Sequence, residues 1–279
     1  MVRVSRLADG AELYRFEGPQ RSSLIGGMLL LSPDTRLLAL AGSENGNWEQ
    51  TVLQIWEMST GKLRRTLKGH GGGVTGCVFS PDGRLVLTAS SDATVLVWDL
   101  GVQSEQKPRK WTEKALASLW DDLGNADAAR ADRAIWALVA AGQQAVPFLR
   151  KNLPPAPAPR PDWRAWVKDL DSEQFAVRDK ASRALEALGE KAYPLLQKAL
   201  TDAPPLEMRR RIEKLLDRLN YPLTSPKTIR ELRAVEVLEH IGTAQARQVL
   251  HKLSLGAPGS RLTDAARASL ERLAKRKAP

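Results

Sequence analysis

The chain has 279 residues, with 42 Lys and Arg against 32 Asp and Glu, so its formal net charge is +10. This basic balance favours acidic partners, and the length suffices for two domains with separate cores. No apolar run approaches the roughly 20 residues of a membrane-spanning helix, and the first residues do not resemble a secretory signal. Cys77 is the only cysteine, which excludes an internal disulfide and favours a reducing compartment. We therefore expect a soluble, cytoplasmic protein without membrane contact.

Residues 1–102 carry a repeated pattern of turns and tryptophans. Ser-Pro-Asp at 32–34 recurs at 80–82, and Trp56 recurs as Trp98. Ser-Pro-Asp favours a tight turn between strands. Short β-rich runs surround these anchors, at 37–41, 52–56, 85–89 and 94–98. Four short strands per repeat are typical of a β-propeller blade.

The start of the chain aligns with the middle of a repeat. Val2 to Gly10 matches Leu53 to Gly61, with Ser5 at the position of Trp56. The chain is therefore predicted to begin in the third strand of a blade, and it supplies about two blades plus strands of a third. A closed propeller has four to eight blades. We expect the missing blades to lie upstream in a longer protein or to come from another chain, which includes self-association.

One repeat carries a recognisable motif. Gly69-His70, the run 78–83, Asp92 and Val97-Trp98-Asp99 together resemble a WD repeat. The resemblance implies a buried, hydrogen-bonded structural tetrad of His70, Thr88, Asp92 and Trp98, which is not catalytic. It also implies that a strand from the start of the chain, here 12–16, completes the last blade beside 94–98.

The preceding repeat departs from the WD pattern. It has Gly18-Pro19 at the Gly-His position and Leu40 at the position of the tetrad hydroxyl. We expect that blade to lack the tetrad and to rely on apolar packing.

The hydrophobic period changes after a polar linker at 103–111, and residues 112–279 are predicted to be helical. The segment 132–142 with 145–153 recurs as 179–189 with 192–200, and a looser third copy runs from 229 to 253. Ser225-Pro226 marks a helix start. Each copy reads as a helix, a glycine stop and a second helix, which resembles a HEAT repeat. The sequence thus predicts a partial all-β propeller of the WD40 type followed by an all-α HEAT-like solenoid.

Two features refine the predicted solenoid. The Pro-rich segment 154–161 interrupts it and predicts a stiff spacer between the first and second hairpins. In the second hairpin, one apolar stripe is expected to pack on the partner helix. The stripe consists of Phe175, Ala181, Leu185 and Leu188, and its partners are Leu195, Leu196 and Leu200.

No motif for catalysis, a cofactor or a metal emerges. The glycine pattern at 71–76 resembles a dinucleotide-binding turn, but a strand rather than a helix is expected after it. His240 and His251 lie on different predicted helices without a nearby Cys or paired His, which argues against a metal site. Nucleophile motifs of the Gly-x-Ser-x-Gly type are missing from the sequence. We expect no catalytic residues, no metal and no cofactor.

One basic cluster invites a functional interpretation, and most of the chain's basic excess lies after Thr112. Basic residues spaced along neighbouring helices can line the groove of a solenoid and contact phosphates. The alternative is that they form ion pairs with Glu207, Glu213 and Asp217 on a solvated face. The candidate basic binding face consists of Lys191, Lys198, Arg209, Arg210, Arg211, Lys214 and Arg218.

The two resemblances together are similar to the C-terminal part of large bacterial proteins in which a propeller precedes helical repeats. They imply a non-enzymatic scaffold that binds other proteins, since both repeat types present broad surfaces without reactive groups. Two alternatives remain open. One is a helical solenoid that binds nucleic acid, and the other is the regulatory tail of a larger enzyme encoded upstream.

Overall fold

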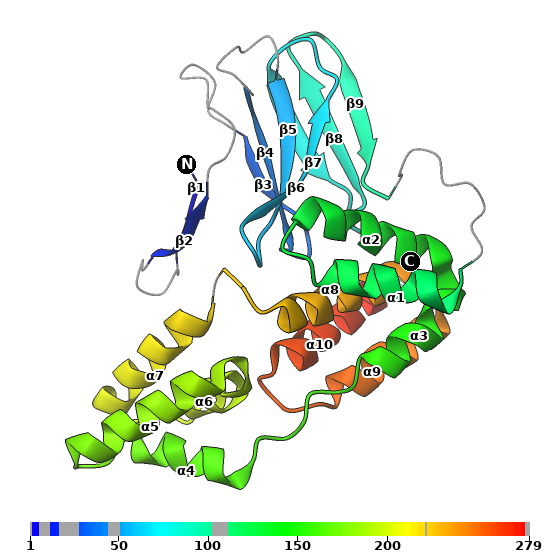
Figure 1. Cartoon of the computed structure of the whole chain (residues 1–279). Helices are drawn as coiled ribbons and strands as arrows, with labels where there is room; N and C mark the ends of the chain where they lie inside the picture. Colours follow the sequence, from blue (N-terminus) through cyan, green and yellow to red (C-terminus); the bar gives the residue numbers. More distant parts are fainter. Residues whose placement is uncertain are drawn as a thin grey trace. The chain divides into compact units, whose positions relative to one another are not determined.

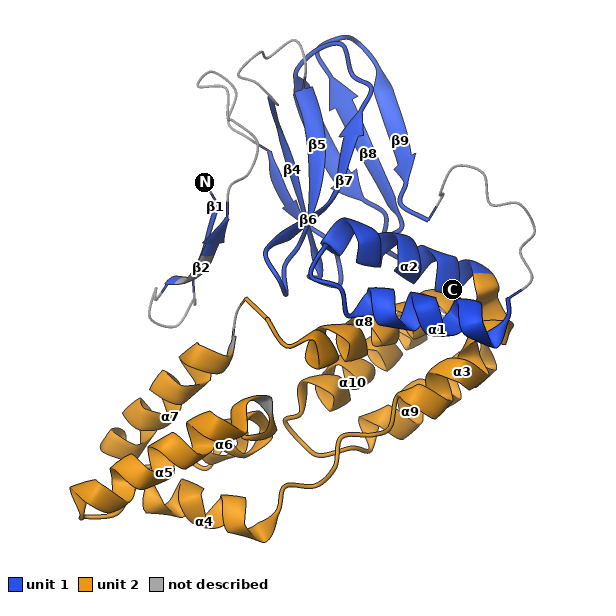
Figure 2. Ribbon diagram, viewed as in Figure 1, with its two compact units in different colours: residues 1–140 blue, residues 141–279 orange. Residues whose placement is uncertain are grey.

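The computed structural model describes residues 2–5, 12–16, 28–43, 51–101, 111–220 and 222–276. The expected linker at 103–111 lies outside these ranges except for its last residue. Two compact units divide the chain, one of residues 1–140 and one of residues 141–279 (Figure 2).

The described residues of the first part of the chain form three antiparallel sheets, with two, four and three strands (Figure 1). Within each sheet, every strand pairs with the strand next to it in sequence, as in the blades of a propeller. The strands are β1 (Val2–Ser5) and β2 (Glu12–Phe16), then β3 (Leu29–Leu31), β4 (Leu37–Ser43), β5 (Thr51–Glu57) and β6 (Lys62–Lys68), then β7 (Val74–Phe79), β8 (Leu85–Ser90) and β9 (Val95–Asp99). The predicted partial propeller, with one four-stranded blade and parts of two others, is confirmed.

Strand β2 lies in the first sheet, where Val2 of β1 pairs with Phe16. The expectation that residues 12–16 complete the last blade is therefore wrong. Because β1 and β2 are adjacent in sequence and joined by a short connection, they pair with each other as a hairpin. Among the described strands, β9 pairs with β8 alone.

The sheets share two apolar cores, one on each face of the four-stranded sheet. Successive residues of a strand point to opposite faces, so Leu38 and Leu40 of β4 join Val2, Phe16 and Trp56 in one core. Ala39 and Ala41 point the other way. Their core also contains Leu53 and Ile55 of β5 and Phe79 and Val86 of the third sheet.

Helices α1 (Glu113–Leu123) and α2 (Ala128–Ala141) follow the sheets, and nearly all of both lies in the first unit. Trp136 of α2 is buried in the same core as Phe79 and Leu100. Asp132, one turn earlier on α2, pairs with the guanidinium groups of Arg64 and Arg65 on β6. Helix α2 is thus packed against the blades through both an apolar and a charged contact. The domain boundaries proposed at 102 and 112 stay a prediction.

From residue 128 onward the described residues form helical hairpins, as predicted for a HEAT-like solenoid, and most of these helices lie in the second unit. Gly142, Gly189 and Gly242 all have positive φ, at 53°, 56° and 61°, and each ends the first helix of a hairpin. The helices after α2 are α3 (Ala145–Asn152), α4 (Pro161–Asp169), α5 (Phe175–Leu188), α6 (Tyr193–Thr201), α7 (Leu206–Asn220), α8 (Pro226–Ile241), α9 (Ala244–Ser254) and α10 (Arg261–Lys275), with 3-10 turns at Gly142–Gln144 and Gly189–Lys191.

The hairpins do not pack in simple sequence order. Helices α4 to α7 share one core around Leu170, Leu185, Leu196 and Ile212, whereas α3 packs beside α9, which in turn contacts α8 and α10. The Pro-rich segment lies between α3 and α4, and residues 153–160 form neither helix nor strand.

The apolar stripe predicted for α5 is correct except at its first residue. Ala181 and Leu185 are buried, and Leu188 packs against the same core. Phe175, however, is 66% exposed. It lies in the first turn of α5 and is mostly open to solvent, with the Arg178 guanidinium 5.8 Å from its ring.

Candidate functional site

The four residues of the predicted tetrad lie together in the third sheet. The Trp98 indole nitrogen donates to Thr88 Oγ1 at 2.8 Å, and Thr88 Oγ1 lies 2.7 Å from His70 Nε2. On the other side of the imidazole, Nδ1 lies 3.3 Å from Asp92 Oδ2. The contacts form one continuous polar chain from β9 through β8 to the loop before β7.

Thr94 extends this chain and was missed by the sequence reasoning. Its hydroxyl donates to Asp92 Oδ1 at 2.6 Å and lies 3.0 Å from His70 Nδ1. The hydrogen bond from the Thr94 hydroxyl is the main cause that lowers the pKa of the Asp92 carboxyl. The sequence signal that could have found Thr94 is its place two residues after Asp92, because an Asp side chain in a turn often bonds the backbone two residues on. The Thr94 amide donates to Asp92 Oδ1 at 2.9 Å.

The glycine-rich run before β7 is a close-packed loop. The Gly71 amide donates to Asp92 Oδ2 at 2.7 Å, and the Gly73 amide donates to Ser91 Oγ at 2.9 Å. A Cβ on Gly72 would lie 2.7 Å from Ser91 Oγ, which leaves no room for a side chain there. Strand β7 follows, so this loop lacks the helix N-terminus that a dinucleotide-binding turn requires. The role of the tetrad as a structural lock stays a prediction.

The outer face of the last sheet is apolar and open. Val78 on β7 pairs in register with Leu87 on β8, and Leu87 pairs with Val97 on β9. Ala89 and Val95 form a second, adjacent pair. Val78, Val95 and Val97 are 54%, 65% and 60% exposed. We call Val78, Leu87, Ala89, Val95 and Val97 the outer blade face.

The equivalent positions of the preceding blade are buried. By the repeat spacing, Leu53 and Ile55 correspond to Val95 and Val97, and they are only 2% and 1% exposed because the third sheet covers them. The chain therefore contains an internal example of what covers such a face, namely the next blade.

The candidate basic face lies on α6, α7 and the 3-10 turn Gly189–Lys191 before α6, and part of it is neutralised. Three of its arginines have carboxylate partners: Arg209 pairs with Glu213 at 3.6 Å, Arg211 with Glu207 at 2.7 Å, and Arg218 with Glu186. The four other cations, Lys191, Lys198, Arg210 and Lys214, are exposed and have no ion pair with any described residue. The basic binding face stays a prediction, with fewer free charges than its sequence suggests.

Across the described ranges, His, Cys, Asp and Glu side chains do not gather in groups of three or more that would suit a metal ion. His240 lies on α8 and His251 on α9. None of the described helices has the length and apolar character needed to cross a bilayer.

Propeller-type sheets followed by helical hairpins define a two-part repeat protein. Residues 61–99 match the WD domain, G-beta repeat family, and residues 177–202 match the PBS lyase HEAT-like repeat family. The chain thus carries a WD repeat followed by a HEAT-like repeat, as its sequence predicts.

Several curated proteins resemble the WD portion. The chain is 39% identical over 93 residues to Protein LST8 homolog of Drosophila melanogaster, covering 32% of this chain and 28% of that protein. It is 41% identical over 56 residues to Small ribosomal subunit protein RACK1y of Oryza sativa subsp. japonica, covering 20% of this chain and 16% of that protein. It is 38% identical over 76 residues to Polycomb protein EED of Chaetomium thermophilum, covering 27% of this chain and 12% of that protein. The chain therefore spans less than a third of the length of each of these relatives.

Proposed function

We propose that this protein is a non-catalytic scaffold that binds other proteins, and that the outer blade face is a principal contact surface. WD and HEAT-like repeats fit a protein-interaction role, because both build extended surfaces from stacked units. The resemblance to WD-repeat proteins is consistent with this role. A cytoplasmic location, favoured by the single cysteine, and the absence of enzymatic activity belong to the same proposal.

The observation that carries the proposal is the difference between two equivalent sheet faces. The face of β4 and β5 that contains Leu53 and Ile55 is buried by the next blade, and the outer blade face is not. Covering three valines that are more than half exposed would contribute on the order of 3 kcal/mol to association. We propose that the partner presents an apolar sheet of blade type, from a second copy of this chain or from another WD-repeat chain.

The alternative of a nucleic-acid-binding solenoid has weaker support. It rests on the basic net charge and on four exposed cations of the second unit, Lys191, Lys198, Arg210 and Lys214. Binding to phosphates would weaken steeply with ionic strength, whereas contact through the outer blade face would not. The regulatory-tail alternative depends on sequence upstream of Met1.

Association of the full chain tests the proposal. Light scattering across a concentration series is expected to show self-association that persists at high salt. The double variant Val95→Lys and Val97→Lys should weaken it by about tenfold or more, because two charges would have to be desolvated at the contact.

Two further variants separate the contact from general effects. Val95→Thr with Val97→Thr keeps β-branched side chains and reports whether the strand itself tolerates change. Leu206→Lys with Leu255→Lys makes the same charge change at leucines that are 64% and 71% exposed in the second unit. If this control weakens association as much as the Val95 and Val97 variant, the outer blade face is not the contact surface.

A further inference from the structure

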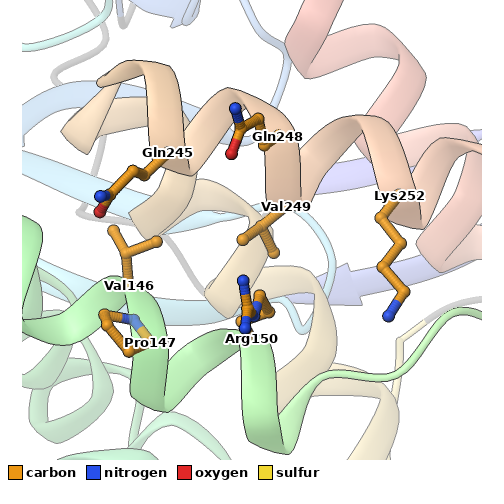
Figure 3. A pocket seen from close by; sticks show the side chains of 7 residues that line it. All are labelled: Val146, Pro147, Arg150, Gln245, Gln248, Val249 and Lys252. Carbon is orange, nitrogen blue, oxygen red and sulfur yellow. The ribbon is translucent and has the colours of Figure 1, made fainter.

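Helices α3 and α9 pack side by side within the second unit, and a groove runs between them. Its volume is about 470 Å³, which is within the usual range for ligand sites. Its lining residues are Val146, Pro147 and Arg150 of α3 and Gln245, Gln248, Val249 and Lys252 of α9 (Figure 3). None of these seven side chains is a carboxylate.

The helical period explains why these side chains meet in one groove. Residues 245, 248, 249 and 252 are spaced by three or four positions, so they share one face of α9. Val146 and Arg150 are related in the same way on α3. The two helices run in the same direction, with Val146 and Gln245 at one end and Arg150 and Lys252 toward the other (Figure 3). The groove therefore has an amide end and a cationic end, with an apolar floor of Val146 and Val249.

The polar side chains that line the groove are free of polar contacts with other described residues. Four side chains are exposed and make no hydrogen bond or ion pair with any residue in the described ranges: Arg150, Gln245, Gln248 and Lys252. By contrast, the neighbouring Arg247 is used structurally: its guanidinium donates to the carbonyls of Gly242 and Leu273. It fixes α9 against the start of its hairpin and against α10, so the groove wall is held in place before any ligand binds.

Helix dipoles alone do not account for this arrangement. Arg150 and Lys252 lie in the last turns of their helices, where cations are favourable. The adjacent Lys151 also lies in the last turn of α3, yet it does not line the groove. The groove face of each helix adds unpaired donors above buried valines, and this combination suits a ligand with both anionic and apolar groups.

We propose that the α3–α9 groove binds an acidic peptide segment of a partner protein, with an aliphatic side chain over Val146 and Val249 and carboxylates at Arg150 and Lys252. The Gln245 and Gln248 amides would then contact the peptide backbone. From residue 245 to 252 the helix rises about 10 Å, which matches three to four residues of extended peptide. This inference is independent of the outer blade face, and the Val95 and Val97 variants should not affect it.

Fluorescence anisotropy with the full chain tests the groove. The probes are a labelled peptide, Gly-Asp-Glu-Leu-Glu-Asp-Gly, and its amide counterpart, Gly-Asn-Gln-Leu-Gln-Asn-Gly. The acidic peptide is expected to bind about tenfold more tightly, equivalent to one charge-assisted hydrogen bond. The double variant Arg150→Gln and Lys252→Gln should remove this difference. Gln248→Lys should tighten binding of the acidic peptide, which keeps the test independent of any loss of folding.

The matched control is Arg210→Gln with Lys214→Gln, which removes two exposed cations from α7 and changes the net charge by the same amount. It is expected to leave peptide affinity unchanged. Equal weakening by both double variants would overturn the proposal in favour of general charge attraction. Equal binding of the two peptides would overturn it as well. So would displacement of the peptide by short oligouridine at equal concentration, which would indicate a phosphate-binding surface instead.

Discussion

Trp56 and Trp98 occupy the same position in successive sheets, yet their indole N–H groups have different acceptors. In the third sheet, Trp98 donates to Thr88 and so joins the polar chain through His70 to Asp92. In the second sheet, Trp56 donates to Gln54 on its own strand at 3.0 Å and stacks on Phe16. Leu40 takes the place of the threonine and is buried in apolar surroundings.

The second sheet has a buried charged group of its own. Glu57 at the end of β5 accepts from Arg64 at 2.6 Å, and both side chains are 2% exposed. Thr60 donates to the same carboxylate at 2.5 Å. Arg64 also lies 3.8 Å from Asp132 of α2. The two sheets thus contain unrelated polar groups. The group in the third sheet joins β8 and β9 to the loop before β7, and the group in the second sheet joins β5 and β6 to α2.

The largest expected loss of folding stability comes from a substitution in the second sheet. Arg64→Met removes the main partner of buried Glu57, and an uncompensated buried charge costs about 3 to 5 kcal/mol. Chemical denaturation monitored by tryptophan fluorescence measures the change. The double variant Arg64→Met with Glu57→Met should recover much of that loss, because two apolar groups can replace a buried pair.

A surface pair provides the control for this comparison. Arg84 pairs with Asp99 at 3.1 Å, but its side chain is 50% exposed. Arg84→Met should therefore cost less than about 1 kcal/mol. Similar losses for Arg64→Met and Arg84→Met would mean that burial does not distinguish the two pairs.

An effect of comparable size, about 2 to 5 kcal/mol, is expected for Trp98→Ala in the third sheet. The variant leaves a cavity and removes the donor to buried Thr88. Trp98→Phe keeps most of the ring and loses only the N–H, so it should cost less. Thermal denaturation of the full chain, followed by near-UV circular dichroism, compares the two. An unchanged melting transition for Trp98→Ala would contradict the structural role of the tetrad.

Local patterns in the sequence were sufficient for most of the elements. The Ser-Pro-Asp turns, the glycine stops and the Ser225 cap are short-range signals with a defined geometry. Ser225 Oγ indeed accepts from the Thr228 amide at the start of α8. The residues His70, Thr88, Asp92 and Trp98 were identified through the repeat motif, and the structure brings them together.

Long-range partners could not be predicted in the same way. Helical periodicity shows which residues share a stripe, but not what covers it, so Phe175 was assigned to a contact that its side chain does not make. The packing of Trp136 with the blades and of α3 with α9 depends on contacts between distant segments. Arg150 and Lys252 are far apart in sequence, and a search for dense basic runs could not connect them.

The smallest expected effect is on the pH dependence of the melting temperature, and it again distinguishes the third sheet from the second. Hydrogen bonds from Thr94 and from the Gly71 amide favour the ionised form of Asp92, so its pKa in the folded state is lowered. A carboxyl whose folded pKa is below its unfolded value stabilises the fold above the unfolded pKa, about 4, and this contribution is lost as the pH falls further. Asp92→Asn should therefore lower the melting temperature at neutral pH and flatten its decline below about pH 4.

The control for Asp92 is Asp34, a turn carboxylate between β3 and β4 of the second sheet. Asp34 accepts from Ser32 Oγ at 2.6 Å and from the Arg36 amide at 3.1 Å, and it pairs with the Arg36 guanidinium at 3.1 Å. Asp34→Asn removes a turn carboxylate without touching the polar chain of the third sheet. If both variants flatten the acid decline equally, turn carboxylates in general cause it. If only Asp92→Asn does so, the decline reports the loss of the network that ties the loop before β7 to β8 and β9.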